Sequence, residues 1–394
     1  MIRSAENLRV LLVADEFPPS ICGIGDYTAN LARALVLKGV EVGVLTKAVA
    51  GLKQEETIDG VKVHRLASDW TAKDIRPILR AAGKLGPGTI VHVQYPSLTN
   101  YQRRLMINLL PPLFRTIQRQ NSLVVTMHGF HEHRLRWRLR VLPMLWANNA
   151  LVFVHPRDRQ QALRWSPFAA GRAALIPIAS NVPGLPPNSA RRHQVRSELG
   201  LAADERIAVY FGEVRPDKGL HTLLDSVEAI HRRGAAARAM VISTVGTLPH
   251  ALTGYEREMM ARLGTGNREG WAILVRGETP QRAAELLQAA DVAAFPFTLG
   301  AAENRGSLMA AVVNGLPVLT TCGISTPPDY EDTYGVETVD ADDSAAFAAR
   351  LETLLESHEL REALAAKANT AGKRFSWSAI AEQSIEVYRK CLSG

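Results

Sequence analysis

With 394 residues, 46% of them hydrophobic and 22% charged, the chain is too long for one ordinary domain and has ample apolar content for two globular ones. It has no apolar run of roughly 18 residues and no signal-peptide pattern, which argues against a membrane-spanning helix and against secretion. Its three cysteines are scattered, which argues against a disulfide scaffold and a zinc site and favours a cytoplasmic protein. The net charge of +7 is uneven, because residues 1–180 hold 24 Lys and Arg against 12 Asp and Glu, whereas residues 181–394 hold 22 against 27.

Apolar strands and amphipathic helices alternate along the first half. Residues Asp26–Lys38 have helical spacing, with Tyr27, Leu31 and Leu35 near one face. Alternation of strand and helix is typical of parallel βαβ units, so we predict an α/β fold with a doubly wound parallel sheet. The strands are predicted at Leu8–Ala14, Glu41–Thr46, Thr89–Gln94, Leu123–Met127, Ala150–Val154 and Ala174–Pro177.

The pattern restarts after residues 180–203, a stretch rich in proline and asparagine. The new strands are predicted at Arg206–Phe211, Arg238–Ser243, Trp271–Val275, Asp291–Phe295 and Pro317–Thr320, with helices near 218–233, 280–290 and 305–314. We therefore predict a Rossmann-like domain at 1–182, a linker at 183–204, a second Rossmann-like domain at 205–375, and a C-terminal helix at 376–394 that packs back toward the first domain. Ligands of such sheets bind beyond the carboxyl ends of the strands.

The first candidate binding loop is the sequence PPSICGIGD, which follows the first strand and opens the first helix. Gly23 and Gly25 let the backbone approach a ligand, and the helix N-terminus favours an anion. A dinucleotide loop would need a third glycine where Thr28 stands, and this loop contains prolines, so a nicotinamide cofactor is disfavoured. A tight turn without a ligand is the alternative.

The second candidate is the sequence FGEVRPDKG, at the carboxyl end of the first strand of the second half. It contains Gly212, and Arg215 and Lys218 supply the positive charge that a phosphate needs. The helix that follows supplies N–H groups. A solvated basic turn is the alternative.

The third candidate spans residues 296–311, where a strand ends, a loop with glycine follows, and a helix begins near Ser307. This is again anion-binding geometry. Glu303 could accept hydrogen bonds from sugar hydroxyls, and the other predicted donor contacts are Asn304, Arg305, Gly306 and Ser307. Alternatively, Ser307 is only a helix cap and Glu303 only a favourable charge near the helix start.

The fourth candidate is His128, in the sequence TMHGF just past a strand of the first half. A histidine at the carboxyl end of a strand, next to a glycine, is expected to face the ligand side of the sheet. A purely structural histidine is the alternative.

Together these motifs resemble the retaining glycosyltransferases of family 4, the glycosyl transferases group 1, which have the GT-B fold. The resemblance covers nearly the whole chain: the PPSICGIGDY opening, TMHG, IPIASN, FGEVRPDKGL, ADVAAFPF and RGSLMAAVVNGLPVLTT, in the order and spacing of the family. It implies two Rossmann-like domains that face each other across a cleft. It also implies transfer of a sugar, with a hexose expected, from a nucleotide diphosphate sugar, with retained configuration and without a metal or another cofactor.

The resemblance also implies roles for single residues. Lys218 falls on the diphosphate lysine of the family, Gly23 on the loop that approaches the donor phosphates, and His128 on the histidine that lines the donor sugar. The usual partner arginine falls on Glu213, and we expect Arg215 to take over its task. His128, Lys218 and Arg215 are therefore the predicted catalytic residues.

Two departures from the family concern the donor. The two glutamates that the family carries fall on Ala302 and Ala310. Glu303 is one residue away from the first, and nothing replaces the second, which usually contacts the ribose. Ser307 or Asn304 is expected to compensate.

The acceptor is not specified by the sequence, and a glycan, a lipid-linked molecule or a small molecule fits a role in polysaccharide biosynthesis. Arg134–Arg140 (RLRWRLR) is basic and aromatic, and such a stretch can rest on an anionic membrane. Peripheral contact with the inner face of the membrane is therefore one hypothesis. The alternative is a helix whose leucines face the core and whose arginines face water.

Three other functions compete with the transferase. A nucleotide-sugar epimerase on the same fold would act on the donor alone, and a catalytically silent relative would bind the nucleotide sugar without reaction. The basic first half also suits nucleic acid, but the sequence has no helix-turn-helix, zinc knuckle or RNA-binding sheet motif, so no nucleic-acid partner is expected.

Overall fold

The computed structural model describes residues 8–20, 22–67, 71–95, 108–130, 135–246, 251–302 and 305–393. The predicted site residues Glu303 and Asn304, and Arg134 of the basic stretch, lie outside these ranges. The chain divides into two compact units, one of Met1–Ala179 with Trp377–Gly394 and one of Ser180–Ser376. No helix in the described part of the chain is long and apolar enough to cross a bilayer.

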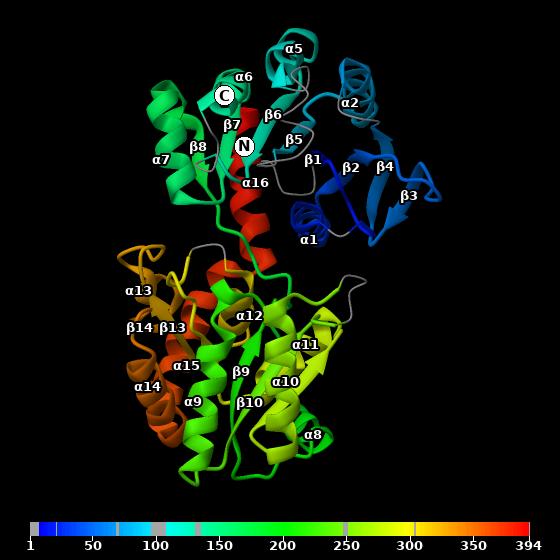
Figure 1. Ribbon diagram of the computed structural model, residues 1–394. Coiled ribbons are helices and arrows are strands. Elements are labelled where there is room, and N and C mark those ends of the chain that lie inside the picture. The colour runs from blue at the N-terminus through cyan, green and yellow to red at the C-terminus, as the bar shows by residue number, and fades with distance from the viewer. Residues whose placement is uncertain are drawn as a thin grey trace. The chain divides into compact units, whose positions relative to one another are not determined.

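The first unit is built on a sheet with the strand order β3-β4-β2-β1-β5-β6-β7-β8 (Figure 1). Neighbouring strands are parallel, except that β3 and β4 form an antiparallel hairpin. The strands are β1 (Arg9–Val13), β2 (Glu41–Lys47), β3 (Glu55–Ile58), β4 (Val61–Ala67), β5 (Ile90–Tyr95), β6 (Ser122–Met127), β7 (Ala150–Phe153) and β8 (Ala173–Leu175). The helices are α1 (Gly23–Leu37), α2 (Ala72–Leu85), α5 (Leu110–Ile117), α6 (Leu135–Trp146), α7 (Pro156–Trp165), the 3₁₀ helix η2 (Pro167–Arg172) and α16 (Trp377–Ser393).

Strand β1 shows why this sheet is covered on both faces. Its side chains alternate, so that Val10 and Leu12 join one apolar cluster and Leu11 and Val13 join another. The first cluster contains the apolar faces of α1 and α16, and the second contains those of α2, α5 and α6. A buried parallel sheet between two helical layers is the result.

The second unit has one sheet in the order β11-β10-β9-β12-β13-β14, with every neighbouring pair parallel. The strands are β9 (Arg206–Phe211), β10 (Ala237–Ser243), β11 (Ala272–Arg276), β12 (Val292–Phe295), β13 (Val318–Cys322) and β14 (Glu337–Asp340). The helices are α8 (Ser189–Glu198), η3 (Pro216–Lys218), α9 (Leu220–Arg232), α10 (Gly254–Glu269), α11 (Pro280–Ala289), α12 (Gly306–Val313), α13 (Tyr330–Tyr334), α14 (Ser344–Glu356), α15 (His358–Gly372) and η4 (Lys373–Phe375). The predicted α/β class with two doubly wound parallel sheets is confirmed.

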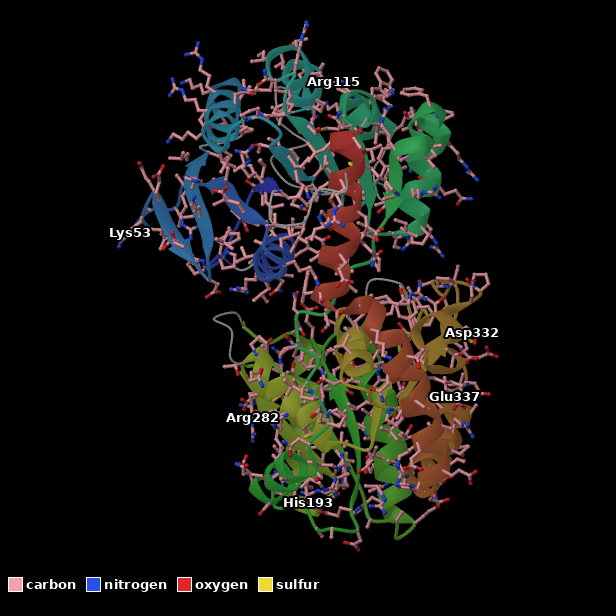
Figure 2. The ribbon with its side chains drawn as sticks, turned by 180° about the vertical axis from the view of Figure 1, so that it is seen from behind. Lys53, Arg115, His193, Arg282, Asp332 and Glu337 are labelled. Carbon is pink, nitrogen blue, oxygen red and sulfur yellow. The ribbon has the colours of Figure 1, made fainter. Side chains whose placement is uncertain are left out.

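The segment predicted as a linker, 183–204, lies within the second unit and contains α8. The side chain of Asn188 caps this helix, and Val195 is buried against the core. Arg282 on α11 forms an ion pair with Glu198 at the end of α8, with 2.5 Å between Nη2 and Oε2 (Figure 2). The prolines therefore mark only the entry to this helix, and not a free linker.

Each sheet has one place where the chain order reverses, and the predicted loops leave the strands there. In the first unit this switch point lies between β1 and β5, and the glycine loop follows β1. In the second unit it lies between β9 and β12, and each of these strands is followed by one of the two predicted loops. Such switch points are the usual ligand sites of doubly wound sheets.

Candidate functional site

Two cations of the second unit lie against one aromatic ring. The Lys218 Nζ atom lies 5.6 Å, and the Arg305 Cζ atom 4.5 Å, from the ring centroid of Phe297. Phe297 is buried and stacks on Phe295 at the end of β12. We call Lys218 and Arg305 the Phe297 cation pair. The ring attracts both charges and holds two like charges close together.

The Phe297 cation pair has unused hydrogen-bonding capacity. Arg305 forms a long ion pair with Asp217, with 3.8 Å between Nη1 and Oδ2, but its buried Nε atom has no partner among the described residues. Lys218 is half-buried, and burial, followed by the charge of Arg305, lowers the pKa of its amino group. An anion placed here would neutralise both cations and accept hydrogen bonds from their free N–H groups.

Arg215 is arranged differently from this pair. Its side chain is 61% exposed and pairs with carboxylates of its own loop, Asp217 at 3.0 Å and Glu213 at 3.6 Å. It stands at the N-cap of η3, one turn before Lys218. The structure therefore groups Arg305, rather than Arg215, with Lys218 on Phe297.

Two glycines allow these loops to approach each other. Gly219 has φ +69°, and a Cβ atom there would lie 1.7 Å from the carbonyl oxygen of Pro296. This distance is too short for any residue other than glycine. Gly212 has φ +140°, and a Cβ atom there would lie 3.5 Å from Cβ of Ser307. The loop after β9 is thus packed directly on the loop after β12 and on the start of α12.

The N-terminus of α12 faces the same region. The N-cap residue Arg305 makes no side-chain cap, and no other described side chain caps this helix, so its first N–H groups, from Gly306 onward, suit a ligand. Ser307 is half-buried beside Gly212. Ala310 is fully buried and Ala302 accepts a hydrogen bond from Tyr330 through its carbonyl oxygen, so neither position offers a carboxylate.

A cavity of about 220 Å³ lies beside this cluster, at the carboxyl ends of β9 and β10. It is lined by Glu213, Val214 and Arg215 after β9, by Ser243, Thr244 and Val245 at the end of β10, and by Glu256 on α10. A larger hollow of about 500 Å³ lies at the opposite end of the sheet, near the start of β13, and contains none of the predicted residues.

In the first unit, the glycine loop ends at the start of α1. Gly23 is the first residue of the helix and is exposed. A Cβ atom added to it would have no neighbouring atom within 4 Å. Gly25 is buried, and a Cβ atom there would lie 3.0 Å from the carbonyl oxygen of Glu16. Cys22 offers no side-chain cap, so the N–H groups of this helix start are also uncapped.

His128 follows β6 and is held by polar and aromatic neighbours. Its Nε2 atom lies 2.9 Å from Oε1 of Gln94, and its ring meets Tyr27 edge to face at 4.9 Å. Its Nδ1 atom has no hydrogen-bond partner in the described part of the chain. Burial lowers the pKa of His128 to about 3, so the ring is neutral near pH 7.

Sequence patterns alone did not indicate Phe297, Gln94 or Tyr27 as site residues. Gln94 gave a weak signal, since it is a polar residue inside an apolar strand. Phe297 lies in the third candidate stretch, but the sequence gave no sign of its role, because this role depends on which cations the fold brings to its ring.

An apolar strip is exposed on α6, within the predicted basic stretch. Leu135, Leu139 and Trp146 are 62%, 53% and 46% exposed and share one side of the helix, since they are spaced by 4 and 7 residues. Val141, Met144 and Leu145 are buried on the other side. The expectation that the leucines of this helix face the core therefore fails for Leu135 and Leu139.

The comparisons with known proteins agree with this geometry. Residues 205–357 match the family described as Glycosyl transferases group 1. The chain is 26% identical to a D-inositol 3-phosphate glycosyltransferase of Xylanimonas cellulosilytica, over 93% of this chain and 91% of that protein. It is 28% identical to an alpha-maltose-1-phosphate synthase of Mycobacterium tuberculosis, over 62% of this chain and 64% of that protein.

Solved structures share the whole fold. A sucrose-phosphate synthase from Thermosynechococcus elongatus aligns with a TM-score of 0.70 at 18% identity, over 98% of this chain and all of that chain. Anabaena Alr3699/HepE in complex with UDP aligns with a TM-score of 0.67 at 17% identity, over 96% and 99% of the two chains. The motifs, the two doubly wound sheets and these likenesses together support a glycosyltransferase with the GT-B fold, whose residues 205–357 match the glycosyl transferases group 1 family.

Proposed function

We propose that this glycosyltransferase moves a sugar from a nucleotide diphosphate sugar to an acceptor hydroxyl, with retained configuration and without a metal ion. The observation that carries the proposal is the Phe297 cation pair, whose free N–H groups adjoin the uncapped start of α12. These are the groups that a diphosphate needs, and the structure of Alr3699/HepE with UDP supports this ligand class.

The chemistry follows from charge on the leaving group. When the bond between the sugar C1 atom and the diphosphate oxygen breaks, negative charge grows on that oxygen. Lys218, Arg305 and the N–H groups of α12 stabilise this charge in place of a divalent cation. The acceptor oxygen attacks C1, and its proton passes to the departing phosphate.

The nucleoside belongs in the cavity lined by Arg215 and Thr244, because this cavity lies at the carboxyl ends of β9 and β10, and Arg215 stands in the same loop after β9 as Lys218. Its volume of about 220 Å³ is that of a small part of the donor and not of the whole molecule. Ser243 and Thr244 supply polar groups to a base or ribose, in a site that lacks the usual glutamate.

His128 has the character of a hydrogen-bonding group and not of an acid. Its neutral ring presents a free Nδ1 atom, which suits a hydroxyl of the donor sugar. Gly23 and the start of α1, where Cys22 offers no side-chain cap, suit an anionic group.

A donor panel tests the proposal. The protein is incubated with nucleoside diphosphates and nucleotide sugars in the presence of a chelator, and its melting temperature is measured. We expect the melting temperature to rise with at least one nucleoside diphosphate and with the nucleotide sugar of the same nucleoside. The rise should be smaller for Lys218→Ala. The absence of any rise at millimolar ligand would contradict the proposal.

Product analysis then separates the reaction types. Released nucleoside diphosphate together with a glycosylated acceptor, of unchanged anomeric configuration, supports transfer with retention. An isomerised donor would instead show the epimerase, and unchanged donor despite tight binding would show a silent relative.

For the acceptor side, we propose contact with an anionic membrane through α6. The exposed strip of Leu135, Leu139 and Trp146 adjoins Phe168, which is 63% exposed and lies 6.4 Å from Trp146 between ring centroids. Arg115 on the neighbouring α5 (Figure 2) lies close enough to Arg172 to lower the pKa of that guanidinium, after the larger effect of burial. Apolar side chains beside unneutralised cations fit an anionic lipid surface.

Sedimentation with vesicles tests this contact. We expect binding to vesicles of phosphatidylglycerol at low salt, weak binding to phosphatidylcholine, and loss of binding in Leu139→Asp. The matched control is Leu37→Asp, because Leu37 is 88% exposed on α1, away from this strip. Equal binding of both variants, or none by the wild type, would contradict the membrane contact.

A further inference from the structure

A chain of buried polar side chains connects His128 to the C-terminal helix. Gln94 Oε1 lies 2.9 Å from His128 Nε2, and Gln94 Nε2 lies 3.4 Å from His92 Nε2. His92 Nδ1 lies 2.7 Å from the hydroxyl of Tyr388 on α16. Exposure of His92, Gln94 and Tyr388 is 1% or less. We call these four residues the polar chain.

Such groups are costly in a core, where apolar residues would pack equally well. Each buried polar atom needs a partner, and each partner adds a further polar atom to satisfy. Thr126 completes the set, since its hydroxyl oxygen lies 2.6 Å from His92 Nε2 and it is fully buried. A satisfied network of this kind fixes the orientation of the groups at its ends.

The polar chain has a direction, because the two ends of the Gln94 amide are different. Its oxygen only accepts, so His128 Nε2 must carry the hydrogen. Its nitrogen only donates, so His92 Nε2 must be the bare nitrogen, which also accepts from the Thr126 hydroxyl. His92 Nδ1 then carries the hydrogen and donates it to the oxygen of Tyr388.

Helix α16 reaches His128 by a second route as well. Trp377, its first residue, meets the ring of Tyr27 at 5.2 Å, and Tyr27 meets His128 at 4.9 Å. Burial lowers the pKa of both His92 and His128 to about 3, which keeps both rings neutral and makes the choice of tautomer meaningful.

We propose that α16, through Tyr388, His92 and Gln94, fixes His128 as the Nε2–H tautomer, so that its bare Nδ1 atom selects donor sugars that offer a hydroxyl at that point. Tyr388, His92 and Gln94 are positioning residues, since none of them touches the substrate in this scheme. The part concerning sugar selection rests on the proposed function of His128, whereas the tautomer does not.

Nitrogen-15 correlation spectra of the full chain, labelled at histidine, show the tautomer directly. Signals of His128 are assigned by their loss in His128→Asn. We expect protonated Nε2 and bare Nδ1 for His128, and the reverse for His92. A wild-type His128 with hydrogen on Nδ1 would overturn the proposal, because the Gln94 amide would then have the opposite direction.

Two variants test whether α16 sets this choice. In Tyr388→Phe, His92 Nδ1–H loses its acceptor, so His92 should move its hydrogen to Nε2, the Gln94 amide should turn, and His128 should shift toward Nδ1–H. In Gln94→Glu, a carboxylate accepts from both rings, so His92 should change tautomer while His128 keeps its hydrogen on Nε2. Unchanged tautomers in both variants would overturn the proposal.

The matched control is Tyr95→Phe, which also removes a buried tyrosine hydroxyl, one that donates to Asn108 Oδ1 at 2.7 Å. We expect it to leave both tautomers unchanged. With an identified donor, Tyr388→Phe should lower kcat/KM about tenfold, the effect of one hydrogen bond lost in the transition state, and Tyr95→Phe less than about twofold. If the protein transfers no sugar at all, the spectra still decide on the tautomer of His128. If transfer occurs but the tautomers are unchanged in both variants, only the positioning role of Tyr388, His92 and Gln94 fails.

Discussion

The switch-point loops of the two units differ in the kind of interaction that they offer. Among the described residues, the loops of the second unit carry three cations, two of them on Phe297, together with the carboxylates of Glu213 and Asp217 and a helix start whose N-cap residue makes no side-chain cap. His128 in the first unit is neutral and makes its polar contact with an amide, Gln94. We propose that the loops stabilise charge in one unit and recognise a hydroxyl in the other, because the side chains after the strands, and not the strands, decide the chemistry.

The largest effect is expected where the second unit has no room for a side chain. Gly219→Ala should lower the free energy of unfolding by at least about 3 kcal/mol, because the new Cβ atom meets the Pro296 carbonyl at a positive φ. Gly234→Ala is the control, since Gly234 has φ +91° but open space around it, and should cost about 1 kcal/mol. Urea unfolding measures both, and equal costs would show that the loops can separate.

The next effect concerns the charge on the leaving group. Lys218→Ala should reduce turnover by about 100-fold to 1000-fold, because the growing negative charge loses one aligned cation. Lys53→Ala, at an exposed lysine of the first unit (Figure 2), should leave turnover unchanged. Turnover of Lys218→Ala near the wild-type level, in a protein with unchanged melting temperature, would remove Lys218 from the mechanism.

The neutral character of the first unit predicts a pH dependence of stability. The pKa of His92 is about 3 in the folded protein, below the ordinary value of about 6.5 in the unfolded chain. The unfolded chain therefore binds the proton first as the pH falls, so stability decreases below about pH 6.5, by about 2 kcal/mol at pH 5 from this residue. Histidine titration by nitrogen-15 spectra is the measurement, and protonation of His92 in the folded protein near pH 6.5 would refute the prediction.

The smallest effect should distinguish Arg215 from Arg305. Arg305→Ala should lower donor affinity by about tenfold or more, since this guanidinium is only 18% exposed and belongs to the Phe297 cation pair. Arg215→Ala should lower it less than about fivefold, because an exposed side chain already paired with carboxylates contributes little. Calorimetric titration with the best nucleoside diphosphate gives both values, and the reverse order would restore Arg215 as the main partner of Lys218.

Most of the fold could be predicted from the sequence, because apolar strands and amphipathic helices alternate and each has a recognisable spacing of apolar residues. The strands β3, β4 and β14 were not predicted. EETI and ETVD are too polar and too short to give a strand signal, whereas VKVHRLA does alternate and its signal was missed. The helical nature of 189–198 was hidden by the prolines before it. In these cases burial against the rest of the unit, which a local pattern does not contain, decides the structure.

The candidate site divides in the same way. Glycines, cations and helix starts at strand ends gave the positions of Lys218, Arg305 and His128, since parallel strands bring their carboxyl ends to one edge. Their partners could not be predicted, because Phe297 lies 79 positions after Lys218, and Tyr388 lies 296 positions after His92. Only the packing of the whole unit joins such residues.

The place of α16 in the first unit has a consequence for biosynthesis. The chain leaves this unit at Ala179 and re-enters it at Trp377, so a ribosome completes all of the second unit before it supplies the last helix of the first. Until then the face of β5 and β6 that α16 covers is exposed to solvent, and His92 lacks its hydrogen-bond partner Tyr388. On the proposed function, a nascent or prematurely terminated chain would carry a complete second unit and an unfinished first unit, and would bind nucleotide without turning it over.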